Sequence, residues 1–146
     1  VYKRQDLDAA RVLDLCAGVG GFGLEALSRG AREVLLLDID PKAVKALRDW
    51  IEAVGATAEA RVERRDVVRG KLPEGPFDVV FLDPPYALWE GEQVLQMIRR
   101  GLACAGPEGL LVLKIPEQMD LPEDPGWRVV RRTAVASAAY ALLASA

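Results

Sequence analysis

The sequence predicts an α/β fold built on a doubly wound, mostly parallel β-sheet. Short runs rich in Leu and β-branched residues recur along the chain and lack the alternation of a half-exposed strand. Such runs are typical of strands that are buried on both faces. Amphipathic helical patterns separate the runs, and parallel strands that alternate with helices are joined by right-handed crossovers. Together these observations predict a sheet with helices on both faces.

Each element has its own sequence pattern. The clearest strands are expected at Arg11–Leu15, Val34–Asp38, Phe77–Asp83 and Leu110–Lys114, with a weaker strand at Ala60–Arg64. Helices are expected at Gly21–Arg29, Pro41–Val54 and Glu90–Ala105, and in the second and third of these the apolar residues recur at helical spacing. The second helix is also well bounded, since Asp40 can cap it, Pro41 suits its first position and Gly55 follows its last turn.

The C-terminal region carries conflicting patterns. Residues Trp127–Thr133 alternate like a strand, whereas Ala134–Ala146 is so rich in Ala that propensity alone favours a helix. We predict a closing antiparallel hairpin, which brings the sheet to seven strands. Residues 11–146 are then expected to form a single domain. Residues 1–10 precede it as an N-terminal stub, and because the sequence begins at Val1 rather than Met we expect a fragment.

Composition narrows the possible functions. The chain has 146 residues, a formal charge of −3 and 51% hydrophobic residues, and it has no run near the ~18 apolar residues of a membrane span. The absence of His excludes Ser-His-Asp and Cys-His catalysis, and two Cys residues cannot assemble a Cys/His zinc site. We therefore expect no metal. Cys16 and Cys104 form no CxxC motif and follow no secretory leader, so we expect a cytoplasmic monomer without membrane contact.

A glycine-rich segment, DLCAGVGGFG over residues 14–23, leaves the first strand and enters a helix. Gly18, Gly20 and Gly23 satisfy the GxGxxG pattern, and Asp38 follows about 20 residues later, as in an NAD-binding domain. Two features favour S-adenosylmethionine instead. Asp14 precedes the glycines, where it can meet a cationic amino group, and the loop is longer than a dinucleotide turn. The Ala17–Gly18 part of the loop is expected to contact this cofactor.

Acidic residues follow several strands of the predicted sheet, at the edge where ligands bind. Asp14, Asp38 and Asp83 end three of the clearest strands, and Asp66 follows the weaker one. Such acids are costly to bury without donors, which indicates a ligand rich in hydroxyls and amines. We expect Asp38 to accept hydrogen bonds from both ribose hydroxyls, with Ile39 against the adenine face. Residues Asp66–Val67 are expected at the adenine edge, although Asp66 also suits a helix cap or a solvated loop.

The most specific motif is Asp83-Pro84-Pro85-Tyr86, directly after a hydrophobic strand. Two prolines fix an extended backbone, and we expect their carbonyls to remain free of sheet and helix amides. Asp83 and the Pro84 carbonyl can then take the two protons of an exocyclic amine, which directs the nitrogen lone pair toward a methyl donor. Tyr86 supplies a ring for stacking on a base. The interpretation is an N-methyltransferase site.

In the order DLCAGVGGFGLEALSRGA, LLLDIDPKAV, RRD and FLDPPY, the sequence resembles class I S-adenosylmethionine-dependent methyltransferases, and most of all bacterial 16S rRNA guanine-N2 methyltransferases of the RsmD type. The resemblance runs from about Arg11 to Tyr140. It implies a Rossmann-like methyltransferase sheet. It also implies that Asp14, Gly18 and Gly20 bind the methionine end of the cofactor, Asp38 the ribose and Asp66 the adenine. The target amine would bind at Asp83–Tyr86, and the partner would be ribosomal RNA or a small-subunit assembly particle.

This chain departs from the family pattern in two places. Family members carry a β-hairpin and a helix before the glycine loop, and the residues after Tyr86, including Trp89, are less basic than expected of a phosphate-binding loop. We expect Trp89 to pack against the following helix. Several alternatives stay open at this point: methylation of adenine N6 in DNA or of a protein glutamine, an NAD-binding oxidoreductase domain, and a cofactor-binding module without catalysis.

Overall fold

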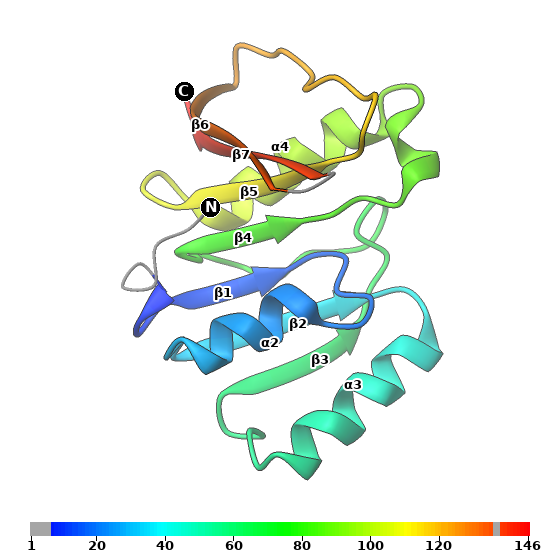
Figure 1. Ribbon diagram of the computed structural model, residues 1–146, viewed down its shortest axis with the longest axis vertical. Coiled ribbons are helices and arrows are strands. Elements are labelled where there is room, and N and C mark those ends of the chain that lie inside the picture. Colours follow the sequence, from blue (N-terminus) through cyan, green and yellow to red (C-terminus); the bar gives the residue numbers. More distant parts are fainter. Residues whose placement is uncertain (1–6, 136–137) are drawn as a thin grey trace.

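A seven-stranded sheet with the order β3-β2-β1-β4-β5-β7-β6 forms the centre of the computed structural model, which describes residues 7–135 and 138–146 (Figure 1). Strands β1 to β5 run parallel, and β7 is antiparallel to both of its neighbours, β5 and β6. The predicted doubly wound, seven-stranded sheet with a closing hairpin is therefore confirmed. The strands are β1 (Arg11–Asp14), β2 (Glu33–Asp38), β3 (Ala60–Arg64), β4 (Val79–Leu82), β5 (Leu110–Ile115), β6 (Trp127–Val135) and β7 (Ala138–Ser145).

Helices cover both faces of this sheet. Helices α2 (Gly21–Ser28) and α3 (Pro41–Ala53) lie on one face, and α4 (Gln93–Ala105) lies on the other (Figure 1). The backbone N–H of Lys42 donates to Asp40 Oδ1 over 2.9 Å, so Asp40 caps α3 as predicted. A short 3-10 helix, η1 (Tyr86–Trp89), precedes α4. Residues 65–78 connect β3 to β4 without a helix.

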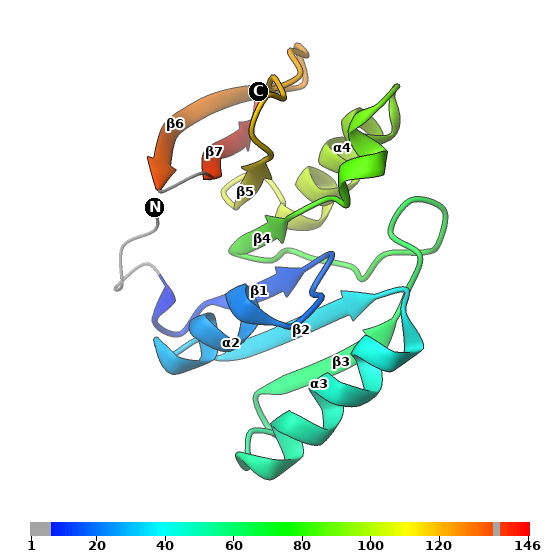
Figure 2. The same cartoon turned by 45° about the vertical axis from the view of Figure 1, so that its right-hand side comes forward.

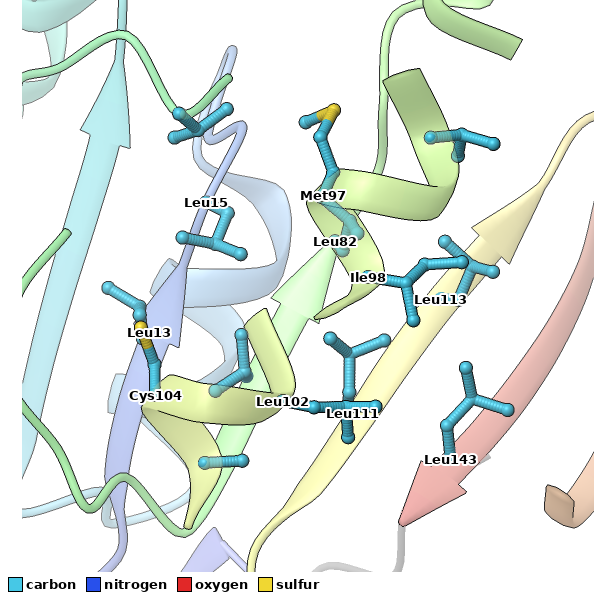
Figure 3. Close-up of a cluster of buried hydrophobic side chains, with 14 of the residues drawn as sticks. Leu13, Leu15, Leu82, Met97, Ile98, Leu102, Cys104, Leu111, Leu113 and Leu143 are labelled. Carbon is cyan, nitrogen blue, oxygen red and sulfur yellow. The ribbon is translucent and has the colours of Figure 1, made fainter. Parts of the chain in front are cut away.

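Two apolar clusters explain why the strands lack alternation. Successive residues of β1 point to opposite faces, so Val12 packs under α2 and α3 while Leu13 packs under α4. The α4 cluster joins Leu13, Leu82 and Leu111 of the sheet to Ile98 of the helix (Figure 3). Trp89 is buried in the same cluster, which confirms its expected packing. Each central strand is thus covered on both faces, as its continuous hydrophobic pattern predicts.

The hairpin and the start of α4 show tertiary structure overriding local pattern. The Ala-rich residues of β7 form a strand because pairing with β5 buries Ala141 and Leu143 completely. The predicted helix Glu90–Ala105 begins three residues later, at Gln93, since Gly91 adopts a left-handed φ of 77° that interrupts the helical path. Figure 2 shows the hairpin at one end of the sheet and α3 at the other.

The N-terminal stub is described only from Leu7 onward, and residues 1–6 lie outside the described ranges. Leu7 and Ala10 are buried in the cluster under α2 and α3. The N–H of Ala9 donates to the Gly30 carbonyl over 2.8 Å. Within the described ranges, no helix is both long and apolar enough to cross a membrane.

Candidate active site

The carboxyl ends of β1, β2 and β4 meet at one edge of the sheet, where two pockets adjoin at Cys16. The first has a volume of about 340 Å³ and the second about 510 Å³. The predicted residues Asp38, Ile39, Asp66, Val67 and Pro85 line the first pocket. The predicted residues Asp14, Ala17, Gly18 and Asp83 line the second pocket. Gly20, Pro84 and Tyr86 line neither.

Asp14 is the buried acid of this edge, with 1% of its surface exposed. Burial raises its pKa to about 7, helped by the negative charges of Asp83 and Asp38, although backbone N–H groups of Gly23 and Cys16 oppose the rise. Its Oδ1 atom has no hydrogen-bond partner among the described residues. A buried acceptor at the wall of a pocket is suited to a cationic or N–H-bearing ligand.

Asp38 connects the glycine loop to β2. Its Oδ2 accepts the Gly18 N–H over 2.8 Å, and its Oδ1 accepts the Asp40 N–H over 2.9 Å. Each carboxylate oxygen can accept a second hydrogen bond, so Asp38 can hold the loop and still receive two ligand hydroxyls. Sequence reasoning missed this bond from Gly18, because it joins backbone and side chain across two strands.

The glycines of the loop have different surroundings. Gly20 caps α2 at a φ of 81°, and a Cβ atom there would lie 2.5 Å from Leu47 Cδ2. Gly20 therefore faces the protein interior. Gly18, at a φ of 55°, has nothing within 4 Å of the equivalent position. The open side of the loop is formed by Gly18 and by Gly21, which also lines the second pocket.

The first pocket is largely apolar. Ile39 is 55% exposed and forms one wall, and buried Val67 forms another. Asp66 Oδ1 accepts the N–H groups of Val68 and Arg69 over 3.0 and 3.2 Å, so this oxygen caps a local turn. Both interpretations of Asp66 therefore hold in part, because it lines the pocket and also stabilises its own loop.

The Asp83–Tyr86 motif continues from β4 into η1. Asp83 Oδ2 lies 3.6 Å from Lys114 Nζ, and no donor in the described ranges reaches the carbonyl of buried Pro84. The expectation that both Pro carbonyls remain free is wrong at Pro85, whose carbonyl accepts the Leu88 N–H over 2.9 Å. This bond closes the first turn of η1. Tyr86, which begins η1, is 60% exposed and available for stacking.

Several lining residues of the second pocket were not predicted. The rings of Phe22 and Phe81 stack with centroids 4.0 Å apart, and both rings reach the pocket. Lys114 and Tyr140 line it from β5 and β7, where their strands pair. The position of Lys114 at the end of a predicted strand was the one available signal. The aromatic pair gave none, because contacts between distant elements leave no local pattern.

A family model described as "Conserved hypothetical protein 95" matches residues 2–144 of this chain. The chain belongs to this family, the RsmD family of methyltransferases. YlbH of Bacillus subtilis, provisionally named an rRNA methyltransferase, is 34% identical over 129 residues, which cover 86% of this chain and 70% of that protein. Ribosomal RNA small subunit methyltransferase D of Haemophilus influenzae is 28% identical over 134 residues, or 89% of this chain and 69% of that protein.

Solved structures agree with the RsmD-family assignment. A methyltransferase structure from Escherichia coli, provisionally described as such, has a TM-score of 0.77 at 27% identity and covers 95% of this chain and 77% of its own. A methylase structure from Haemophilus influenzae has a TM-score of 0.80 at 24% identity, covers 97% of this chain and 90% of its own, and supports the fold. Membership of the RsmD family sets aside the NAD-binding interpretation of the glycine loop.

The two pockets fit an elongated ligand with unlike ends. The apolar walls of the first pocket suit a planar ring, and the unpartnered Oδ1 of Asp14 in the second suits an ammonium group. Asp38 lies between them with lone pairs to spare. S-adenosylmethionine has this order of groups: adenine, ribose hydroxyls and a cationic methionine end.

Proposed function

We propose that this RsmD-family chain uses S-adenosylmethionine to methylate the exocyclic N2 amine of a guanine in small-subunit ribosomal RNA. The observation that carries the proposal is the acceptor group at the end of β4. There the Asp83 carboxylate and the unengaged Pro84 carbonyl adjoin a pocket that also contains the unpartnered Asp14 oxygen. We propose that residues 11–146 act as one catalytic domain.

The cofactor is held at both pockets. Asp14, Ala17 and Gly18 receive its methionine end, and the backbone turn that Gly20 permits positions the loop around it. Asp38 accepts hydrogen bonds from the ribose hydroxyls. The adenine lies between Ile39 and Val67, with Asp66 at its edge. When bound, the cofactor supplies an electrophilic methyl group on a sulfonium.

The acceptor group orients the target amine. Asp83 and the Pro84 carbonyl each accept one N–H of the amine, and Pro85 fixes the backbone that presents them. This leaves the nitrogen lone pair facing the cofactor, so proximity and orientation supply the catalysis. Alkylation makes the nitrogen acidic, and its proton leaves to Asp83 or water without a stronger base. Tyr86 stacks on the base after it has left its own stack.

Ribosomal RNA is favoured over other acceptors by the relatives. The small subunit methyltransferases D of Haemophilus influenzae and Escherichia coli match this chain over 89% and 91% of its length. A type II methyltransferase from Vibrio, M.VspI, is 31% identical over only 58% of this chain and 22% of its own length. Ribosomal protein L11 methyltransferase of Synechococcus covers 97% of this chain but 48% of its own length. We infer that the acceptor is RNA.

The test is transfer of a labelled methyl group from S-adenosylmethionine to unmodified small-subunit rRNA, supplied both naked and in partly assembled particles. The nucleosides are then identified by mass spectrometry. The proposal predicts N2-methylguanosine at one position of at least one of these acceptors. Methylated adenosine, or methyl transfer to neither acceptor, would contradict it.

A further inference from the structure

One cation lies within the second pocket. Among the described residues that line it, Lys114 is the single positively charged side chain, facing Asp14, Glu25 and Asp83. Lys114 Nζ lies 3.6 Å from Asp83 Oδ2. The side chains are 39% and 40% exposed, so both reach the solvent-accessible mouth of the site.

Backbone pairing fixes this arrangement. Leu82 of β4 and Leu113 of β5 are register partners, so Asp83 and Lys114 occupy the next positions on two adjacent strands. Lys114 is in turn the register partner of Tyr140 on β7, whose residue also lines the pocket. The ammonium is therefore held beside the acceptor group by three strands of the sheet.

Stability does not account for a lysine at this position. Ion pairs with this exposure contribute little to folding. An amine target also needs only acceptors, and a cation beside Asp83 competes with that target for the carboxylate. An ammonium has three N–H donors, of which Asp83 takes one. The remaining donors are available to a group of the bound base.

The Watson–Crick edge of guanine presents the matching pattern. It has two N–H donors, at N2 and N1, followed by an acceptor, O6. The two oxygens of Asp83 and the ammonium of Lys114 form the complementary row of acceptor, acceptor and donor. Adenine offers an amine followed by a bare nitrogen lone pair, which would face a carboxylate oxygen.

We propose that Lys114 is a specificity-determining residue that donates to guanine O6 while Asp83 receives the amine. The inference rests on the proposed function and adds to it the group that selects the base. Lys114→Met should therefore lower transfer to guanine more than transfer to a base that has the amine but lacks O6. The base 2-aminopurine is such a substrate.

The experiment compares these two bases at the methylated position. A synthetic oligoribonucleotide carrying guanine or 2-aminopurine there is ligated into the rRNA, and kcat/KM is measured with wild type and with Lys114→Met. We expect the guanine preference to fall about tenfold in the variant, with the Kd for S-adenosylmethionine unchanged. Lys45→Met, which removes an exposed lysine of α3 outside both pockets, should leave the preference unchanged.

Three other outcomes are informative. An equal loss of transfer to both bases would show that Lys114 only positions Asp83, and would overturn the inference. Weaker cofactor binding with an unchanged preference would assign the ammonium to the cofactor carboxylate, and would also overturn it. If wild type methylates neither base, the proposed function itself fails. Thermal unfolding of each variant confirms that it is folded.

Discussion

Asp14 is the residue whose burial and charge are most directly linked to cofactor binding. Its carboxyl group is buried at the end of β1, and its Oδ1 atom lacks a partner among the described residues. A charged group in this setting costs stability unless a ligand compensates it. We infer that the unliganded protein tolerates this cost because the same oxygen is needed for the cofactor ammonium.

Asp14→Asn should stabilise the unliganded protein at pH 8. The pKa of Asp14 is raised from 3.8 to about 7 in the folded state, so the free energy of unfolding falls as pH rises between these values. The neutral amide removes this loss, which has an upper bound of about 4 kcal/mol. Thermal unfolding should show a Tm several degrees higher than wild type at pH 8, with the difference shrinking toward pH 4. A variant that is less stable at both pH values would contradict this.

The same residue should make cofactor affinity depend on pH. Below pH 7 Asp14 is largely protonated and must lose a proton before it can pair with the ammonium, so binding weakens as pH falls. Calorimetric titration with S-adenosylmethionine should show a Kd that rises up to tenfold from pH 7 to pH 6, with proton release. Asp14→Asn should bind more weakly and lose this pH dependence. An unchanged pH dependence in the variant would assign it to another group.

Most positions of the candidate site could be predicted from residues, but their bonds could not. Acids at strand ends and the Asp83–Tyr86 motif are local patterns, and they lie at the pocket edge as expected. The bond from Gly18 to Asp38 and the pairing of Lys114 with Asp83 depend on strand register. The Pro85 carbonyl was wrongly expected to be free, since the 3-10 turn that engages it has no clear sequence signal.

At the scale of elements, the glycine loop shows how packing and ligand access are divided. Gly20 lets α2 approach α3, because a side chain there would collide with Leu47. Gly18 leaves its side of the loop open. The GxGxxG pattern thus combines one position required by the fold with one that faces the site.

Gly20→Ala should destabilise the protein more than Gly18→Ala. Both residues have positive φ, so each substitution costs about 1 kcal/mol in backbone strain. Only at Gly20 does the new Cβ meet another side chain, 2.5 Å away, which adds about 1–3 kcal/mol of overpacking. Urea unfolding of the two variants measures the difference. Equal losses would show that Leu47 moves aside without cost.

Elements were predictable where one pattern dominated and shifted where two competed. The amphipathic spacing and the Asp40 cap located α3 to within one residue. The Ala-rich end was assigned to a hairpin against its helix propensity, and the structure confirms the strand because β5 offers an open edge to pair with. The start of α4 was missed because a single glycine conformation decides it.

At the scale of the whole molecule, the hairpin completes the sheet that carries the site. Strand β7 pairs with β5, and its Leu143 is fully buried in the cluster under α4. The hairpin is therefore part of the same core as β1 and β4. The topology was predictable because strands alternate with helices, whereas the order of the closing strands was implied by family resemblance.

Leu143→Ala should lower the stability of the entire domain. Removing a fully buried Leu side chain costs about 2–5 kcal/mol through lost burial and a residual cavity. Urea unfolding should remain a single transition with an unchanged m-value, since hairpin and sheet share one core. Val130→Ala on β6, where the side chain is 46% exposed, is the matched control and should change stability little. A separate early transition in Leu143→Ala would show that the hairpin folds independently.

The central claim is that separate groups hold the cofactor and the target amine. Asp83→Ala tests it most directly, with S-adenosylmethionine affinity measured by calorimetry and methyl transfer to rRNA measured on the same preparation. We predict that transfer falls by at least about a hundredfold, as for loss of a group that orients the reacting atom, while the Kd for the cofactor changes less than about threefold. Equal loss of binding and transfer would contradict the role assigned to Asp83.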